Sequence, residues 1–133
     1  MNYGYYDEAL NVKLEPSDEI ERYPIQLYEH LCSKINLNNL KVLEVGSGRG
    51  GGASYIARYH KPKIIYGIDL SSKAIDLCKD THNEENLEFL VGDSASIPFD
   101  NDSFDVVINV ESSHCYPSLP KFVNEVSRVL KKE

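Results

Sequence analysis

A glycine-rich stretch near the middle of this chain has the residue types and spacing that point most directly to chemistry. Residues 42–45 read as a short apolar strand, and a run with glycine at positions 46, 48, 50, 51 and 52 follows at once. Glycine adopts positive φ and has no side chain, so such a run can turn sharply and approach a ligand closely. Residues 53–60 can then begin a helix whose free N–H groups face that ligand. The stretch predicts a site for a nucleotide-like cofactor.

The glycine spacing leaves two cofactor classes open. Gly46, Gly48 and Gly51 satisfy the G-x-G-x-x-G spacing of dinucleotide sites. Glu44 together with Gly46, Gly48 and Gly50 satisfies the E-x-G-x-G-x-G spacing that is seen in S-adenosylmethionine (AdoMet) sites. Residues further along the chain have to decide between the two.

Two carboxylates near this stretch are candidates for cofactor contacts. Asp69 follows the second predicted strand, where a carboxylate can accept hydrogen bonds from both ribose hydroxyls, although it could instead cap a helix. Glu44 lies inside an apolar strand, and a carboxylate in that setting needs a partner. We expect Glu44 to order the glycine turn and to lie near a cationic end of the cofactor, rather than to point outward from a half-exposed strand.

Polar residues also end the third and fourth predicted strands. Asp93 follows the third strand and could accept a hydrogen bond from an adenine amino group, with Ser94 and Ala95 lining the base; the alternative is an ordinary turn acid. After the fourth strand, His114 has a near-neutral reference pKa and could act as a general base, with Glu111 as second candidate.

Several neighbouring residues have plainer interpretations. A lone histidine such as His114 is more often a structural hydrogen-bonding residue, and we expect Cys115 to be a buried, inert thiol rather than a nucleophile. Near the N-terminus, Tyr5 and Tyr6 belong to a cluster of tyrosines that could close over a cofactor and offer ring faces to a cation. The same tyrosines could simply anchor a loose terminus.

Hydrophobic periodicity predicts the elements that position these residues. Strands are expected at 41–45, 64–68, 87–91 and 104–110. Helices are expected at 24–34, 50–59 and 118–130, and another follows a cap at Ser71 or Ser72 and ends before the polar loop at 82–85. Asp18 and Glu21 have capping-box spacing. Alternating strands and helices predict a parallel α/β sheet with helices on both faces. The nearly continuous apolar run of the fourth strand predicts burial on both of its faces. Each candidate residue then lies at a carboxyl strand end, where such sheets bind ligands.

Composition narrows the class of protein. The chain has 133 residues, enough for one domain, and we divide it into an N-terminal flap at 1–17 and a cofactor-binding part at 18–133. Its net charge of −7 argues against nucleic acid as the main partner. Three widely spaced cysteines and scattered histidines indicate reduced thiols and no metal site. With no signal peptide and no apolar run of membrane-spanning length, we expect a cytoplasmic protein.

Taken together, four motifs resemble those of class I AdoMet-dependent methyltransferases. They are residues 44–50, Gly67-Ile68-Asp69-Leu70-Ser71, Gly92-Asp93-Ser94-Ala95 and Phe104-Asp105-Val106-Val107. The resemblance decides against a nicotinamide dehydrogenase and implies AdoMet as the cofactor, with Ser47, Leu70 and Asn109 added to its binding residues. The Asn-Tyr-Gly-Tyr start and residues 109–116 are more narrowly similar to small-molecule and lipid methyltransferases of the phthiotriol, sterol and polyketide type.

The resemblance also carries expectations about architecture and activity. It implies a Rossmann-like, doubly wound sheet of order 3-2-1-4, truncated from the seven strands of the complete fold, and methyl transfer to a small-molecule or lipid acceptor, at oxygen. The fourth strand would then be an apolar edge, which invites pairing with a second copy of the chain. Two alternatives stay open at this point: a cofactor-binding module that is catalytically incomplete and acts by dimerisation or through a partner, and a structural remnant that binds no cofactor.

Overall fold

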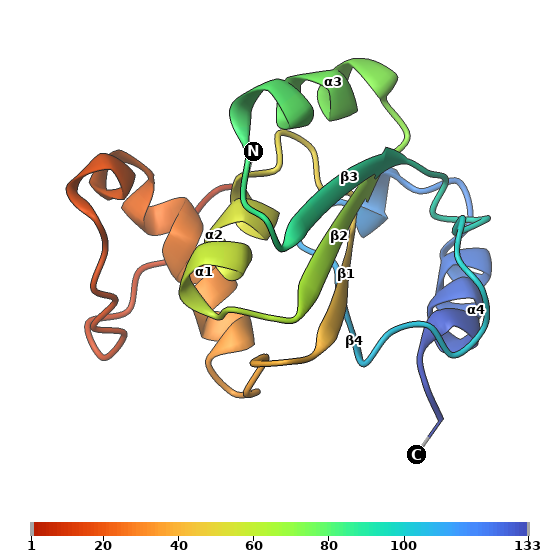
Figure 1. The fold of residues 1–133 in the computed structure, drawn as a ribbon, viewed down its shortest axis with the longest axis horizontal. Helices are drawn as coiled ribbons and strands as arrows, with labels where there is room; N and C mark the ends of the chain where they lie inside the picture. The colour runs from red at the N-terminus through yellow and green to blue at the C-terminus, as the bar shows by residue number, and fades with distance from the viewer. Residues whose placement is uncertain (1, 133) are drawn as a thin grey trace.

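Four parallel strands form a single sheet in the computed structural model, which describes residues 2–132; Met1 and Glu133, the outer ends of the two predicted domains, lie outside the described residues. The strands are β1 (Lys41–Val45), β2 (Ile64–Asp69), β3 (Leu87–Val91) and β4 (Val106–Ile108). They are arranged in the order β3-β2-β1-β4 (Figure 1). The predicted strand order and the parallel α/β class are therefore confirmed.

Helices cover both faces of the sheet. One face packs against α1 (Arg22–Cys32), α2 (Gly51–Tyr59) and α3 (Ser72–Thr81), and the other packs against α4 (Leu119–Val129) (Figure 1). Two short 3₁₀ helices, η1 (Pro16–Glu21) and η2 (Ser113–Cys115), lie before α1 and after β4. Ser71 and Ser118 cap α3 and α4 by accepting hydrogen bonds from backbone N–H groups three residues on. Among the described residues, none of these helices has the length and apolarity needed to cross a bilayer.

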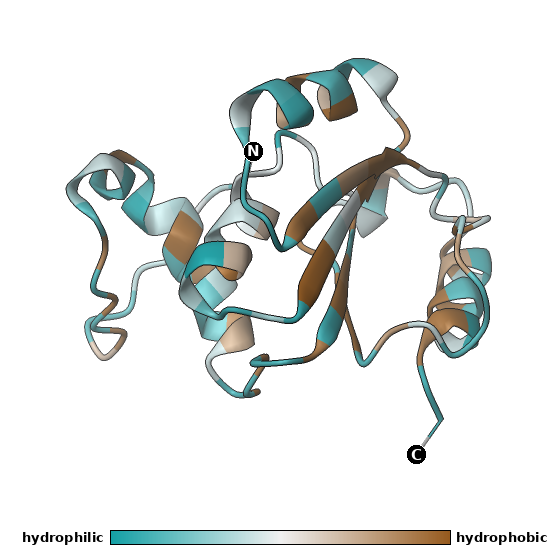
Figure 2. Ribbon diagram, in the orientation of Figure 1, coloured by the Kyte–Doolittle hydropathy of each residue, from teal (hydrophilic) through white to brown (hydrophobic). Residues whose placement is uncertain are grey.

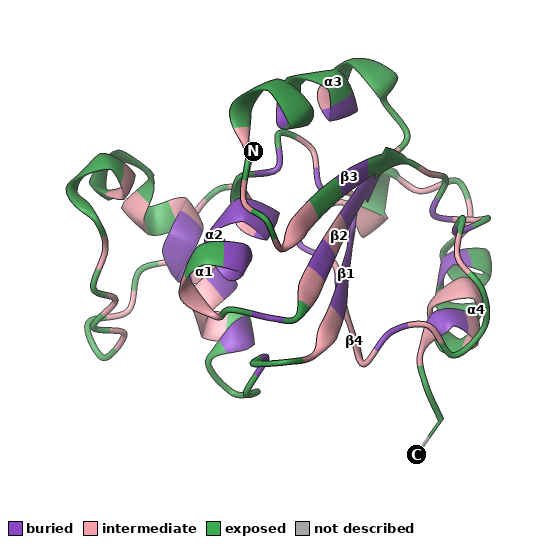
Figure 3. Ribbon diagram, viewed as in Figure 1, coloured by how far each residue is buried: buried purple, intermediate pink, exposed green. Residues whose placement is uncertain are grey.

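The core is divided by the sheet, because successive side chains of a strand point to opposite faces. On β1, Val42 belongs to the cluster under α1, α2 and α3, whereas Leu43 and Val45 belong to the cluster under α4. The central strands β1 and β2 carry most of their brown, hydrophobic segments where the burial view is purple, while other segments of both strands are pink (Figures 2 and 3). Glu44 differs from these apolar neighbours on β1, because its side chain carries a carboxyl group and is nevertheless fully buried.

The fourth strand is shorter and less buried than the apolar run predicts. Only Val106, Val107 and Ile108 pair with β1, while Phe104 makes an isolated bridge to Leu130. β4 lies at the edge of the sheet, so Val106 and Val107 are only half-buried. Val106 packs against the cluster under α1, α2 and α3, and Val107 packs against the cluster under α4, so both faces of the strand are covered as expected, but less completely than in a central strand. Pairing of two chains through this edge stays a prediction.

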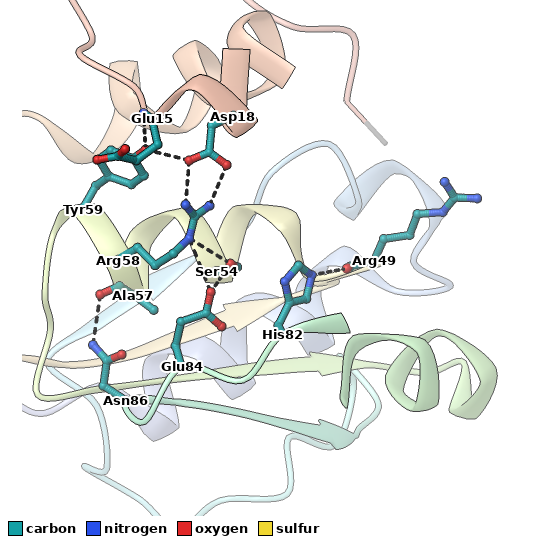
Figure 4. Close-up of polar contacts among 10 residues, drawn as sticks. All are labelled: Glu15, Asp18, Arg49, Ser54, Ala57, Arg58, Tyr59, His82, Glu84 and Asn86. Atoms are coloured by element: carbon teal, nitrogen blue, oxygen red, sulfur yellow. Dashed lines mark hydrogen bonds and ion pairs between the residues drawn. The ribbon is translucent and has the colours of Figure 1, made fainter. Parts of the chain in front are cut away.

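The predicted capping box at Asp18 is also corrected. Asp18 lies within η1, and its carboxylate binds the Arg58 guanidinium of α2 at 2.6 Å and accepts a hydrogen bond from the Tyr59 hydroxyl (Figure 4). Arg58 also contacts Glu84, in the loop before β3, at 3.4 Å. A side chain that local spacing assigned to a helix end therefore joins the N-terminal segment to α2. These contacts fasten η1 and the loop before β3 to α2.

The last helix shows a smaller departure from the predicted pattern. Apolar spacing predicts an inward face made of Phe122, Val123, Val126, Val129 and Leu130. Phe122 and Val129 are buried, but Val123 is 54% exposed. Only one face of α4 contacts the sheet, and Val123 lies outside the stripe that faces the core.

Candidate functional site

The glycine turn between β1 and α2 has the backbone geometry that its composition predicts. Gly46, Gly48 and Gly50 have φ values of 80°, 54° and 77°, a region that other residues rarely adopt. The N–H groups of Gly46 and Ser47 both donate to the Ile68 carbonyl at the end of β2, at 2.8 and 3.0 Å. The turn is therefore fastened across the carboxyl ends of the two central strands.

A cavity of about 990 Å³ opens at this edge of the sheet. Many of the predicted site residues line it: Gly46, Ser47, Gly48, Asp69, Leu70, Asp93, Ser94 and Glu111. Its other wall comes from the N-terminal segment and α1, through Asn2, Pro24, Ile25 and Tyr28, and from the loop after β4, through Ser112, Cys115, Tyr116 and Pro117. The fold thus brings the ends of all four strands to one hollow.

Asp69 is oriented by two backbone groups. Its Oδ2 accepts a hydrogen bond from the Gly48 N–H at 2.9 Å, and its Oδ1 accepts one from the Ser71 N–H at 2.9 Å. Each carboxylate oxygen can still accept a second hydrogen bond. Asp69 therefore joins the glycine turn to the start of α3 and keeps acceptor capacity toward the cavity.

The loop after β3 places a second carboxylate on the same wall. Asp93 accepts a hydrogen bond from the Ala95 N–H at 2.8 Å, and Ser94 is buried at 8% exposure. Asp93 and Ser94 line the cavity, while Ala95 is not among the lining residues within 2–132.

On one side of the turn, Tyr28 contacts both Glu44 and Gly52, and we call this group the α1 contact. The Tyr28 hydroxyl donates to Glu44 Oε1 at 2.5 Å. A Cβ atom at Gly52 would overlap the Tyr28 ring, so the aromatic ring lies directly on the first turn of α2. Burial raises the pKa of Glu44 to about 7, against the opposing effect of the Tyr28 hydrogen bond, and burial also raises the pKa of Tyr28.

On the other side, three polar side chains converge on the Val45 carbonyl, and we call them the β4-loop cluster. Asn109 Nδ2, Ser112 Oγ and Tyr116 Oη lie within hydrogen-bond distance of that oxygen, at 2.8, 3.2 and 3.3 Å. They also lie 2.7 to 2.8 Å from one another, so these donors divide their N–H and O–H hydrogens between the Val45 carbonyl and their neighbours in the cluster. A Cβ atom at Gly46 would overlap Ser112 and contact Tyr116, so the cluster packs directly against the turn.

The two predicted general bases, Glu111 and His114, differ in their position relative to the cavity. Glu111 lines the cavity, and its Oε2 accepts a hydrogen bond from the Tyr3 N–H at 2.9 Å. His114 is exposed in η2 and is not one of the lining residues in the described part of the chain. Cys115, predicted to be buried, is an exposed free thiol on the cavity wall, because the chain after β4 runs over the surface as a short 3₁₀ turn.

Besides Ala95, five predicted cofactor residues are not among the lining residues within 2–132: Tyr5, Tyr6, Glu44, Gly50 and Asn109. Tyr5 packs against His30 with ring centroids 4.5 Å apart, and Tyr6 is 64% exposed and forms a T-shaped pair with Tyr23. Gly50 lies under the turn, where an added Cβ would meet Phe89, Cys78 and His82. Asn109 contacts the Val45 carbonyl at the end of β1 and not the cavity. Closure of the two tyrosines over a cofactor stays a prediction.

Sequence reasoning missed Tyr28, Ser112 and Tyr116 as members of the site. Tyr28 has the spacing of a helix core residue, and nothing in its neighbours indicates a buried carboxylate as its partner. Ser112 and Tyr116 lie in a loop, and hydrophobic periodicity predicts helices and strands but not the path of a loop. Gly52 was a signal that could have indicated Tyr28, because a glycine at the start of a helix allows a neighbouring side chain to approach the helix closely.

Comparison with known proteins adds sequence relatives. The family model described as "Methyltransferase domain" matches residues 43–133. A fatty-acid O-methyltransferase of Mycolicibacterium smegmatis is 47% identical over 132 residues, which cover 98% of this chain and 48% of that protein. A phthiotriol/phenolphthiotriol dimycocerosates methyltransferase of Mycobacterium leprae is 47% identical, with 98% and 49% covered. This chain spans about half the length of these relatives.

A solved structure agrees with the fold. The crystal structure of a SAM-dependent methyltransferase from Aquifex aeolicus superposes with a TM-score of 0.73 and 24% identity, over 90% of this chain and 69% of that one. This similarity supports the sheet and helix arrangement.

Proposed function

This chain belongs to the family of methyltransferase domains, and we propose that it binds AdoMet and takes part in methyl transfer to an oxygen of a lipid acceptor. The observation that carries the proposal is the convergence of the glycine turn, Asp69 and Asp93 on one cavity of about 990 Å³. The names of the two mycobacterial relatives supply the acceptor class: fatty acids in one and phthiotriol-type lipids in the other. They favour an enzyme over the alternative of a catalytically incomplete binding module.

The residues present suit AdoMet in three respects. Gly48 has no atom within 4 Å of an added Cβ, so the turn leaves open space for a ligand against its backbone. Asp69 is already oriented and can accept from ribose hydroxyls. Glu44 Oε2 and Ser47 Oγ are buried polar atoms with no hydrogen-bond partner among residues 2–132, as expected beside an absent polar ligand.

In the proposed arrangement, the ribose lies at Asp69 and the adenine lies near Asp93 and Ser94, on the β2 and β3 side of the cavity. The amino-acid end then lies at the turn, between β1 and β4. When bound, AdoMet supplies a sulfonium methyl group that is already strongly electrophilic. The chain's own task is to position the acceptor and to exclude water.

A base would assist an oxygen nucleophile, and the chain offers Glu111 and His114. Glu111 lies on the cavity wall, whereas His114 lies outside the lining, so the placement supports Glu111 more strongly. The Tyr3 N–H orients the Glu111 carboxylate. Both assignments remain proposals for this chain, as does the acceptor.

The test is a calorimetric titration of the chain with AdoMet and with S-adenosylhomocysteine. We expect Asp69→Asn to weaken binding of both ligands by about tenfold or more, because charge-assisted hydrogen bonds to the ribose are lost. Asp76→Asn is the matched control, since Asp76 is exposed on α3 and lies outside the lining residues. A folded wild-type chain that binds neither ligand would refute the proposal.

A further inference from the structure

Tyr28 contributes to the site from outside the region that the family model matches. It lies in α1, whereas the match begins at residue 43. Its hydroxyl donates to Glu44 at 2.5 Å, and its ring lies on Gly52 at the start of α2. Tyr28 is 8% exposed and Glu44 is fully buried, so this hydrogen bond is shielded from water. The contact therefore ties a side chain of α1 to both ends of the glycine turn.

The second oxygen of Glu44 has no such support. Glu44 Oε2 is buried and has no hydrogen-bond partner in the described part of the chain, although the Ala53 N–H lies close enough to favour the charged carboxylate. Glu44 itself does not line the cavity within residues 2–132; it lies directly behind Val45 and Gly46, which do. Leaving one oxygen of a buried carboxylate unsatisfied is costly, and a cationic or hydrogen-bonding ligand group would relieve that cost. Since Tyr28 holds Oε1, it also decides where Oε2 points.

We infer that Tyr28 is a positioning residue of the cofactor site, which holds Glu44 so that its carboxylate attracts the ammonium group of the cofactor from behind the lining residues Val45 and Gly46. The inference rests on the proposed function, since AdoMet and S-adenosylhomocysteine both carry an α-ammonium group. The ammonium attracts the ionised form of Glu44 and not the protonated form. Cofactor binding is therefore coupled to loss of the Glu44 proton.

The sign of the pH dependence follows from the groups around Glu44. Burial raises its pKa to about 7, so below that pH a proton must leave before the carboxylate is ionised and can attract the ammonium. The other titratable groups that act on it come from α1, β2, α3 and the loop after β4: Tyr28, Cys32, Asp69, Cys78 and Tyr116. Burial raises the pKa of Cys32 to about 12 and that of Cys78 to about 11, which keeps both thiols neutral near pH 7.

The experiment measures the dissociation constant of S-adenosylhomocysteine for the 133-residue chain from pH 5.5 to 8.5. Wild-type affinity should rise with pH and level off once Glu44 is ionised. Tyr28→Phe removes a hydrogen bond to the charged form, so its midpoint should move to higher pH and its affinity at pH 7 should fall, on the order of tenfold. Glu44→Gln should show no midpoint near neutrality.

Tyr66→Phe is the matched control. Tyr66 lies on β2 against Phe99 and Phe104, and within residues 2–132 its hydroxyl has no hydrogen bond and does not line the cavity. It should reproduce the wild-type profile. A Tyr28→Phe profile with the wild-type midpoint would overturn the inference, and so would a midpoint retained in Glu44→Gln.

A double variant covers the case in which Tyr28→Phe unfolds. In a Glu44→Gln background no carboxylate is left unpaired, and adding Tyr28→Phe should then change affinity less than twofold. A loss as large as tenfold in that background would show that Tyr28 acts independently of Glu44 and would overturn the inference. Failure of the proposed function looks different: the wild-type chain would bind no S-adenosylhomocysteine at any pH, and the inference would fall with it.

Discussion

The glycine turn is held from two sides by contacts of opposite design. The α1 contact is a single buried hydrogen bond from Tyr28 to a carboxylate that is itself fully buried. The β4-loop cluster is half-buried, and its three donors share one neutral acceptor, the Val45 carbonyl. One side therefore depends on one bond to a charged group, and the other distributes its bonds over several neutral groups.

Because of this difference, the two sides of the turn should respond differently to mutation. Removing one donor from the β4-loop cluster leaves two others on the same oxygen, so no buried group is left unsatisfied. Removing the Tyr28 hydroxyl leaves Glu44 with no strong donor at either oxygen. The α1 contact should thus be sensitive to mutation and to pH, and the β4-loop cluster should be insensitive to both.

The largest expected effect concerns the charge of Glu44. Its pKa in the folded state, about 7, lies above the ordinary value of 4.5, so the folded chain holds the proton more tightly than the unfolded chain. Proton binding by Glu44 therefore stabilises the folded chain fully below about pH 4.5, and this stabilisation is lost as pH rises through 7. The free energy of unfolding should fall by about 3 kcal/mol in total over that range. Urea unfolding from pH 5 to 8 measures it, and Glu44→Gln should flatten the profile.

Other carboxylates act outside that window. Ion pairs with Arg58, Lys131 and Arg128 lower the pKa values of Asp18, Asp105 and Glu125, so their stabilisation is present above about pH 4 and is lost only below it. A wild-type stability that rises from pH 5 to 8, with the same slope in Glu44→Gln, would contradict the account of the α1 contact.

The next effect tests the packing of the α1 contact. Gly52→Ala places a methyl group inside the Tyr28 ring and should lower the free energy of unfolding by about 2 kcal/mol. Gly51→Ala is the matched control, because nothing lies within 4 Å of its Cβ and alanine favours helix. It should be neutral or stabilising by up to about 1 kcal/mol. Similar losses in the two variants, measured by urea unfolding at pH 7, would show that Tyr28 does not press on the helix.

The smallest effect belongs to the β4-loop cluster. Tyr116→Phe leaves Asn109 and Ser112 on the Val45 carbonyl and should lower stability by less than about 1 kcal/mol. Tyr28→Phe, the same chemical change on the other side of the turn, should cost about 1 to 3 kcal/mol at pH 8. Thermal and urea unfolding of the pair give the comparison directly. A loss in Tyr116→Phe equal to that in Tyr28→Phe would remove the distinction between the two sides.

Much of the fold was predictable because its signals are local. The apolar runs at 41–45, 64–68 and 87–91 became β1, β2 and β3 with bounds correct to within one residue. Ser71 and the glycines of the turn carry their own conformational preferences, so a cap and a set of positive φ values could be assigned without knowing any long-range contact. The order of the strands came from the resemblance to a family.

The errors share a different origin. Asp18 has the spacing of a helix cap but pairs with Arg58, 40 residues away, and Cys115 is exposed because of the path of the loop after β4. The apolar run at 104–110 gave a three-residue strand, since an edge strand has a neighbour on one side only. In each case the decision depended on elements that are distant in the chain.

Periodicity, glycine chemistry and motif spacing were therefore sufficient to determine the class of fold, the glycine turn and the carboxylates around one cavity. The amino-acid order could not show which group satisfies Glu44, because a buried charge takes whichever donor the packing brings to it. Tertiary structure alone brought Tyr28 of α1 onto Gly52 and Glu44, and gathered Asn109, Ser112 and Tyr116 at Val45. Local preference acts over a few residues, whereas the satisfaction of buried polar groups is settled only when the helices dock against the sheet.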